Sequence, residues 1–228
     1  MAQYNNFSVS ISKGKFYLKS KTPQDGYVEV KYGMDKDKIT YHKYVDRVEG
    51  YINDVSISEV DYEGRKLRFL EVAFKEENGV VDKVSVSLMT NNGGYSQEAR
   101  NLISCLKFAD FSKRISLTPS LSNYTDKNGK PRTNLNIYGN YPEELGDNGK
   151  PISTGYIKYE DEPAPTQKTV AGQTVWDFSE KTEFYYQELN KIIEKFGSTT
   201  TTPPQQEKKA TKVKKDEPVA VELDDLPF

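Results

Sequence analysis

Tyrosine and lysine recur together along three short segments near the N-terminus. The residues concerned are Lys15, Tyr17, Lys19, Tyr27, Lys31, Tyr41 and Lys43. In the first segment the two lysines and the tyrosine occupy every second position, which places them on one face of a β-strand. Aromatic rings stack on unpaired bases and ammonium groups contact phosphates, so such rows suit a single-stranded nucleic acid. The alternative interpretation is an ordinary exposed strand face, where both residue types are tolerated.

Two later segments each combine one tyrosine with several cations. The first contains Tyr62, Arg65 and Lys66, and the second contains Tyr124, Lys127, Lys130 and Arg132. Both include a glycine at a turn-like position, so we expect them to be loops. A loop with an aromatic ring and cations can stack a base and follow a phosphate backbone. The alternative is a pair of solvated turns, because Lys and Gly are common in turns.

Residues suited to covalent or metal catalysis are scarce. The chain has one Cys, Cys105, and one His, His42, so an internal disulfide is impossible and a four-ligand zinc site is nearly excluded. We expect Cys105 to be a packed small residue. A metal-dependent nuclease is the remaining enzyme interpretation, because Asp25 and the segment Glu29-Val-Lys31 superficially match an acid-x-Lys site. Since that pattern is common on exposed strands, we expect no enzymatic activity, no cofactor and no metal.

The hydrophobic pattern predicts a mainly β protein with two helices. Alternating segments are expected to be strands at 7–11, 16–18, 27–32, 39–45, 47–60, 66–75, 83–89, 113–121 and 133–139. Helical spacing predicts a helix at 96–107 capped by Ser96, and another from Asp177 to 196 with Glu180 in a capping box. Residues 123–132 and 140–176 are expected to be loops. Gly50 interrupts the longest strand, which indicates a bend.

The elements between residues 46 and 140 follow the order of three strands, a helix and two strands. This is the order of the OB-fold, a five-stranded, partly open barrel that binds through strands 2 and 3 and loops 1–2 and 4–5. The two segments with a tyrosine and several cations would then be these two loops. The strands within 7–45 would extend the barrel or add a sheet. We therefore predict one OB-fold domain over residues 1–197.

The composition changes after Gly197. Residues 198–228 combine a Thr- and Pro-rich stretch, a Lys-rich stretch and an acidic end, so we expect them to be disordered. The formal net charge of the chain is −2, but five of its 34 acidic residues lie in 216–228. The rest of the chain therefore has 32 basic against 29 acidic residues, a balance that is compatible with binding phosphates.

The last five residues carry the most specific pattern in the chain. They are Asp224, Asp225, Leu226, Pro227 and Phe228. This ending resembles the terminal peptide of bacterial and phage single-stranded DNA-binding proteins, in which acids precede an apolar residue, Pro and Phe. The bland alternative is an acidic tail that only keeps the chain soluble. The extra strands before residue 46 and the second helix make a divergent phage-type member the better match.

The resemblance implies a protein that binds and protects single-stranded DNA, largely without sequence specificity, during replication, recombination or repair. It also implies that the tail docks partners such as a polymerase, a helicase-primase or recombination factors, and that it competes with DNA for the binding groove. Such a protein acts in the cytoplasm, that of the bacterial host if a phage encodes it, and a homo-oligomer is compatible with this role. No apolar run is long enough for a membrane span, so we expect no membrane contact. An RNA-binding or architectural OB-fold protein is the alternative, because one sequence does not reveal whether a 2′-hydroxyl is read.

Overall fold

The computed structural model describes residues 4–32, 38–62, 64–76, 79–90, 93–126, 129–170 and 173–196. Lys127 and the tail at 198–228, with its acidic ending, lie outside the described residues. The described chain is mainly β, as predicted. None of the helices in these ranges is long and apolar enough to cross a membrane.

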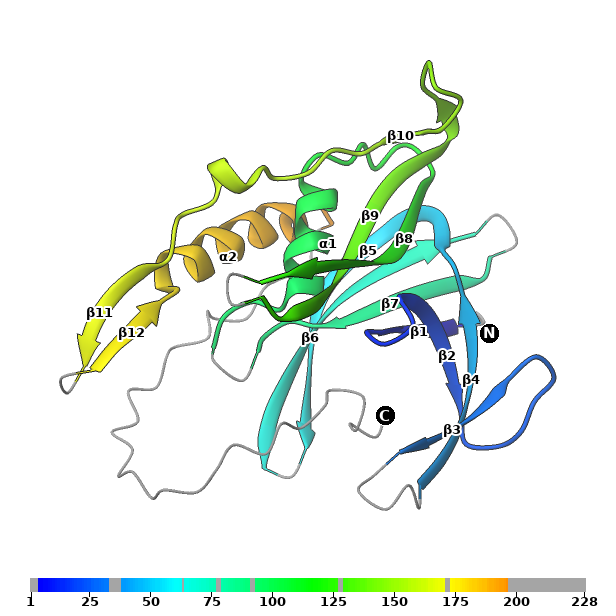
Figure 1. Ribbon diagram of the computed structural model, residues 1–228. Helices are drawn as coiled ribbons and strands as arrows, with labels where there is room; N and C mark the ends of the chain where they lie inside the picture. The colour runs from blue at the N-terminus through cyan, green and yellow to red at the C-terminus, as the bar shows by residue number, and fades with distance from the viewer. Residues whose placement is uncertain are drawn as a thin grey trace.

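Ten strands form one sheet (Figure 1). In chain order they are β1 (Tyr4–Ser10), β2 (Lys15–Ser20), β3 (Val28–Tyr32), β4 (Lys38–Val45), β5 (Val48–Tyr62), β6 (Arg65–Lys75), β7 (Val81–Ser87), β8 (Ile115–Thr125), β9 (Pro131–Leu145) and β10 (Pro151–Ser153). Their order across the sheet is β10-β9-β8-β5-β6-β7-β1-β2-β4-β3. The pair of β1 and β7 is parallel, and the other neighbouring strands are antiparallel.

The sheet is open, which corrects the prediction of a five-stranded barrel. The five strands expected in that barrel are β5 to β9, and they do lie together in the order β9-β8-β5-β6-β7. Closing them would require β7 to pair with β9. The N-terminal strand β1 pairs with β7 instead, from Tyr4 opposite Val81 to Ser8 opposite Ser85. An unpaired strand edge offers free backbone groups to another strand. Here β1, which is not one of the five strands, occupies the edge of β7.

Two glycines allow close approaches within the sheet. Gly14 has a φ of 60° in the turn after β1, and a Cβ atom there would lie 2.6 Å from Cγ of Leu121 in β8. The turn between β1 and β2 therefore contacts β8 closely. At Gly50, a Cβ atom would lie 3.2 Å from Cβ of Phe74. β5 pairs with β8 from Val48 to Gly50 and with β6 from Tyr51 onward, so Gly50 lies where the pairing partner of β5 changes.

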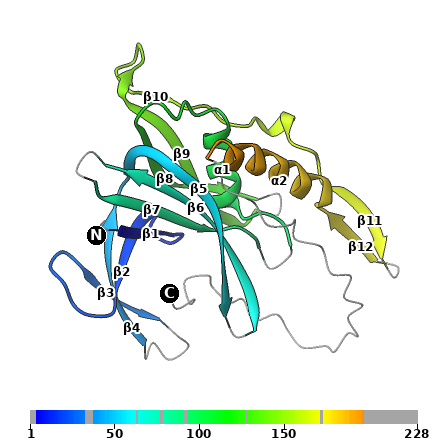
Figure 2. The ribbon, with the colours of Figure 1, turned by 180° about the vertical axis from the view of Figure 1, so that it is seen from behind.

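Two helices cover the apolar face of the sheet. They are α1 (Gln97–Lys107) and α2 (Ser179–Glu194), which lie together on the opposite side of the molecule from β3 (Figures 1 and 2). The predicted cap of α1 is confirmed, because Oγ of Ser96 accepts a hydrogen bond from Ala99 N at 3.0 Å. The predicted capping box of α2 is absent: its N-cap is Phe178, which makes no side-chain cap bond.

The core lies between the inner face of the sheet and the two helices. Its members alternate along the strands and follow the helical spacing; they include Phe16, Leu70, Val72, Phe74, Val84, Leu102, Leu106, Leu189 and Ile192. Removing this apolar surface from water is the main stabilising contribution to the fold. Cys105 is also buried, where burial raises the pKa of its thiol to about 11 and its Sγ donates to Ile137 O at 3.3 Å. The prediction that it is a packed small residue is therefore confirmed.

Two segments expected to be loops contain strands. β8 extends to Thr125 and β9 begins at Pro131, so half of 123–132 is paired. β9 then continues to Leu145, and the segment 140–176 also holds β10, a short 3-10 helix (Tyr159–Asp161), β11 (Thr166–Val170) and β12 (Gln173–Asp177). These segments are polar, but a neighbouring strand satisfies their backbone groups whatever the side chains are. The prediction from local composition therefore gave strands that were too short and too few.

Candidate nucleic-acid interface

Three aromatic rings gather on the outward face of β2 and β4. Tyr17 lies directly opposite Tyr44, and the ring of His42 stacks on that of Tyr17 with a centroid separation of 4.3 Å and an interplanar angle of 15°. The Tyr44 ring is 6.1 Å from Tyr17 and 5.9 Å from His42. Phe16 and Leu18 point to the core, as the alternation predicted. We call Tyr17, His42 and Tyr44 the aromatic cluster.

His42 is held in a neutral state within the aromatic cluster. Burial, followed by the charge of Lys19, lowers the pKa of the imidazole to about 4. Its Nε2 lies 3.1 Å from Oγ1 of Thr40, and its Nδ1 lies 3.5 Å from the Tyr44 hydroxyl. At neutral pH the ring is therefore a flat, uncharged surface that orients Tyr17.

Two lysines flank the aromatic cluster on the same strand face. Burial, followed by the charge of Lys21, lowers the pKa of Lys19, and its Nζ lies 5.3 Å from the centre of the Tyr32 ring. Lys15 forms an ion pair with Asp46 at 2.9 Å, with both side chains largely exposed. Exposed ion pairs contribute about 0–1 kcal/mol, so a phosphate can replace the carboxylate at little cost.

The other expected residues of the N-terminal strands lie elsewhere. Tyr41 is opposite Ser20 and Lys43 is opposite Leu18, which places both on the face that carries Leu18 rather than on that of the aromatic cluster. Lys31 shares their face and forms an ion pair with Glu29 at 3.6 Å. The structure therefore divides the expected set between two faces of the sheet.

Two more of the expected tyrosines, Tyr27 and Tyr62, lie away from the aromatic cluster. Tyr27 precedes β3, and its backbone N–H donates to Gln24 O at 3.1 Å. In the hairpin of β5 and β6, Tyr62 lies directly opposite Arg65, as an aromatic–cation pair beside the turn.

Lys66 lies next to this pair but is engaged by an acid. It forms an ion pair with Glu59 at 2.8 Å, and Arg68 contacts the same carboxylate at 3.0 Å. These two hydrogen bonds, that of Lys66 first, lower the pKa of Glu59. The Glu59 carboxylate is thus ion-paired with two cations in a part of the surface that was expected to contact phosphates.

The hairpin of β8 and β9 also carries an aromatic–cation pair. Tyr124 is 47% exposed and lies opposite Arg132. Arg132 forms an ion pair with Asp126 at 3.0 Å, and the Lys130 backbone N–H donates to the same carboxylate, also at 3.0 Å. Asp126 therefore orders this turn, a role that the sequence analysis did not assign.

Further candidate contacts were missed by the sequence analysis. Alternate positions of β9 continue the row from Arg132 through Asn134 and Asn136 to Tyr138, which is exposed. On the central strands, Phe69 is half-buried and lies opposite two serines. Alternation along 132–138 could have identified the β9 row, whereas His42 and Tyr44 join Tyr17 only through the pairing of β2 with β4.

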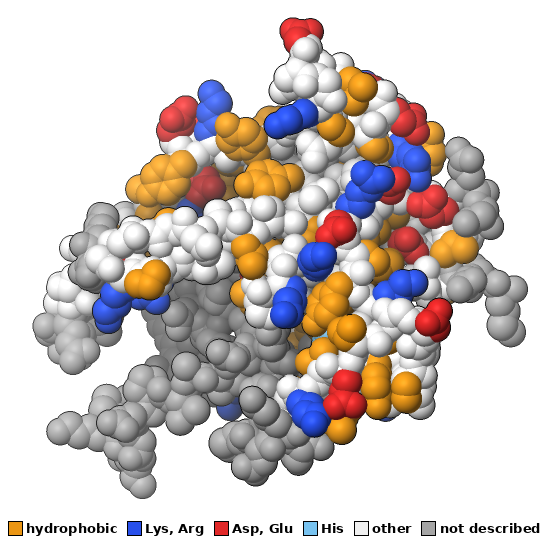
Figure 3. Space-filling model, turned by 45° about the vertical axis from the view of Figure 1, so that its right-hand side comes forward, with side chains coloured by type: hydrophobic (Ala, Val, Ile, Leu, Met, Phe, Trp, Pro, Cys, Tyr) orange, Lys and Arg blue, Asp and Glu red, His pale blue; other side chains and the backbone are white. Residues whose placement is uncertain are grey.

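Charges of both signs are mixed on the surface. Figure 3 shows cationic side chains in a broken diagonal row, with acidic and hydrophobic side chains between them. Of the expected cations, Lys15, Lys31, Lys66 and Arg132 are ion-paired. Lys19, Lys43, Arg65 and Lys130 form no ion pair with another described residue. The described part of the chain has no group of three or more His, Cys, Asp or Glu side chains that could hold a metal.

Comparisons with models of protein families, with curated protein sequences and with solved structures found no match to the chain.

Proposed function

We propose that the chain binds single-stranded DNA, largely without sequence specificity and without chemistry. The observation that carries this proposal is the aromatic cluster, in which Tyr17 is stacked on a neutral imidazole between Lys15 and Lys19 on an outward strand face. A ring of this kind can stack any base, and each such contact is worth about 1–3 kcal/mol. The pair of Tyr124 and Arg132 on the β8–β9 hairpin offers the same chemistry.

The order of the strands supports an OB-type architecture that has been opened. β5, β6 and β7 precede α1, and β8 and β9 follow it, while the five strands lie side by side. β1 occupies the edge at which a closed barrel would be completed. The candidate contacts lie on the β5–β6 and β8–β9 hairpins of this arrangement and on the neighbouring strands β2 and β4.

The acidic tail completes the proposal. On the strength of its resemblance, residues Asp224 to Phe228 dock replication, recombination or repair proteins, while the rest of the chain protects the strand. Physically, the carboxylates resemble phosphates and the Phe228 ring suits an apolar pocket of a partner.

A three-way binding assay tests the proposal. Fluorescence anisotropy would compare a labelled single-stranded DNA, its duplex and an RNA of the same sequence, with Mg²⁺ present and the products examined on a gel. We expect the single-stranded DNA to bind most tightly and to remain intact. Equal binding of the duplex would contradict the proposal, tighter binding of RNA would favour an RNA-binding protein, and cleavage would favour a nuclease.

A further inference from the structure

Two neighbouring cavities lie beside α1, away from the aromatic cluster. The first, between α1 and α2, has a volume of about 210 Å³ and is lined by Tyr95, Phe178 and Lys181. The second, between α1 and β9, has a volume of about 230 Å³ and is lined by Asn136, Tyr138 and Tyr156. Arg100 and Tyr185 line both, so the two cavities are adjacent. We call them the first and second pockets.

Two residues that line the first pocket have buried donor atoms that lack an acceptor. The Tyr95 side chain is only 6% exposed, and neither its hydroxyl nor Nε of Arg100 has a hydrogen-bond partner among the described residues. Burial raises the pKa of Tyr95, so its hydroxyl keeps the proton that it can donate. A buried donor without a partner costs about 1–3 kcal/mol. Because both donor atoms are covered by the wall of the pocket, a ligand with acceptor atoms would reach them only after the side chains move.

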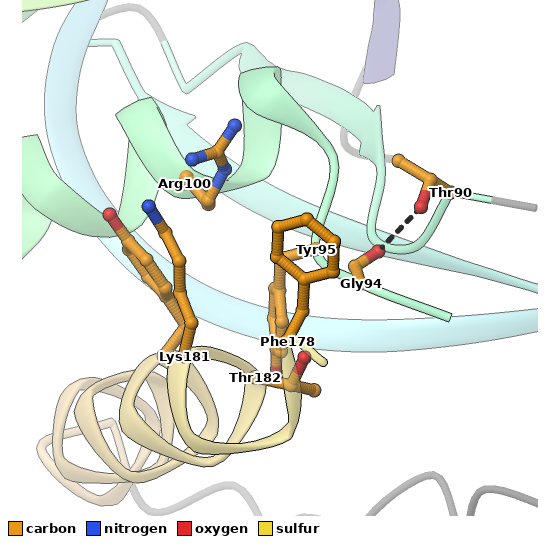
Figure 4. A pocket seen from close by; sticks show the side chains of 8 residues that line it. Thr90, Gly94, Tyr95, Arg100, Phe178, Lys181 and Thr182 are labelled. Atoms are coloured by element: carbon orange, nitrogen blue, oxygen red, sulfur yellow. Dashed lines mark hydrogen bonds between the residues drawn. The ribbon is translucent and has the colours of Figure 1, made fainter. Parts of the chain in front are cut away.

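The charged side chains in the lining of the first pocket, Arg100 and Lys181, are both cations. Figure 4 shows Lys181 extending from α2 towards Arg100 of α1, with Phe178 beside Tyr95. Lys181 forms an ion pair with Glu162, which also accepts a hydrogen bond from the Tyr185 hydroxyl at 2.6 Å. One carboxylate thus faces two cationic groups, a balance that favours an anionic ligand.

Exposed rings and a fixed amide line the way into the pockets. Phe178 is 44% exposed in the first pocket, and Tyr156 is 67% exposed in the second. Nδ2 of Asn101 donates to Leu135 O at 3.2 Å and lies 3.5 Å from Oδ1 of Asn136. The ligand that fits carries a flat ring, hydrogen-bond acceptors and negative charge, which describes an unpaired nucleobase with its phosphate.

The second pocket is continuous with the candidate interface. Tyr138 and Asn136 line it, and they share one face of β9 with Arg132. Arg132 and Tyr138 are six positions apart along the strand, a span of about 20 Å. A single strand that contacts Tyr124 and Arg132 can therefore follow β9 into the pockets.

We propose that the first and second pockets take up unpaired bases of the same single strand that runs along β9, with Phe178 and Tyr156 as stacking residues. This inference rests on the proposed function. It adds a binding site, built by the two helices and β9, that is separate from the aromatic cluster on β2 and β4.

Photo-cross-linking tests the inference on the full chain. Oligo(dT) that carries 5-iododeoxyuridine would be irradiated in complex with the protein, and the adducts would be located by mass spectrometry. We expect adducts at Tyr156, Tyr138 or Phe178. Adducts confined to the aromatic cluster and Tyr124 would overturn the inference but leave the proposed function intact. A chain that fails to bind the oligonucleotide would instead contradict the proposed function itself.

A matched pair of variants gives a second readout. Tyr156→Ala removes a lining ring, whereas Tyr4→Ala removes a ring of similar exposure, 61% against 67%, that lies in β1 and in the lining of neither pocket. We expect the first to weaken binding of oligo(dT) about 5- to 150-fold and the second by less than about twofold. Tyr156→Phe should restore most of the affinity because the ring face remains. Equal affinities of the two alanine variants would contradict the inference.

Discussion

At the scale of single residues, the stack of Tyr17 on His42 determines what the candidate surface can do. A ring held by a neighbour loses little freedom when a base stacks on it, so less of the stacking energy is lost. The neighbour is also uncharged at neutral pH, because burial and Lys19 lower the pKa of His42. The cluster therefore acts as a rigid aromatic surface, and the adjacent lysines supply the charge.

Replacing Tyr17 with Ala should weaken the binding of single-stranded DNA by about 1–3 kcal/mol, because the stacking ring is lost. Tyr41→Ala is the matched control, since Tyr41 lies in the paired strand but on the other face. We expect the control to lose less than about 0.5 kcal/mol. Anisotropy titrations measure both affinities, and circular dichroism checks the fold. Similar losses in both variants would place the interface elsewhere.

His42 should make the stability of the fold depend on pH. Its pKa of about 4 in the folded chain lies below the ordinary value of 6.5, so between these values the unfolded chain binds more protons. Stability from this residue is therefore complete above about pH 6.5 and declines as the pH falls towards 4. After allowance for solvent screening of a half-exposed ring, we expect a loss of about 1 kcal/mol.

Urea unfolding of the wild type and of His42→Gln at several pH values from 7 to 4 isolates this effect. The carboxylates titrate in both proteins, so the difference between the two curves reports His42 alone. We expect the wild type to lose stability relative to the variant as the pH falls. A difference that stays constant over this range would show that the folded chain does not depress the His42 pKa.

At the scale of elements, the approach of α1 to β9 positions the second pocket. Gly139 of β9 makes this approach possible, because a Cβ atom there would lie 2.6 Å from Oγ1 of Thr154 and 3.0 Å from Cβ of Cys105. Both Thr154 N and Thr154 Oγ1 donate to Gly139 O, at 2.9 and 3.2 Å. The strand, the helix and the segment after β10 thus meet at a position without room for a side chain.

Gly139→Ala should lower the free energy of unfolding by about 1–3 kcal/mol, the usual cost of inserting a methyl group into a packed site. Gly146→Ala is the control, because its nearest neighbour, Oδ1 of Asn148, would be 3.7 Å from the new Cβ atom. We expect that variant to change stability by less than about 0.5 kcal/mol. Denaturant unfolding compares the two, and equal effects would mean that the contact with α1 can relax.

At the scale of the whole molecule, the mixture of charges limits the electrostatic part of binding. Several expected cations are ion-paired, so we expect only about three or four phosphates to be neutralised. For a single strand this corresponds to a slope of log K against log salt of about −2 to −3. Titrations at several salt concentrations measure the slope. A slope near zero would show that the protein neutralises no phosphates. A much steeper slope would mean that the ion pairs open on binding.

Deleting residues 216–228 should tighten the binding of single-stranded DNA, most of all at low salt. The segment carries five acids on a tether, which holds them near the cations at a millimolar effective concentration. Thermal stability should hardly change, because a segment of this composition buries little apolar surface. Removing Phe228 alone should leave DNA affinity nearly unchanged and abolish binding of a replication partner. Weaker DNA binding after the full deletion would show that the acids do not compete with phosphates.

Part of the fold could be predicted because it depends on local periodicity. The alternation of Phe16, Tyr17 and Leu18 identified the inward and outward faces of β2, and the cap at Ser96 identified the start of α1. Gly50 stood out in the sequence as a glycine inside a strand, and in the structure it permits the close approach of Phe74. The mainly β class follows from the same alternation. The faces of β2 and the start of α1 depend on residues that are close together in the sequence.

Only the tertiary structure decided which side chains meet. A shift of one residue in strand pairing reverses the face of every side chain, so the sequence alone could not tell whether Tyr17 joins Tyr41 or Tyr44. Long-range contacts also decide that β1 pairs with β7, where a closed barrel would need β9. The ion pair of Arg132 with Asp126 likewise joins the two sides of a hairpin. The two pockets beside α1 form where three elements meet. Local periodicity determines the face of each strand, but long-range pairing determines the neighbours with which that face forms a site.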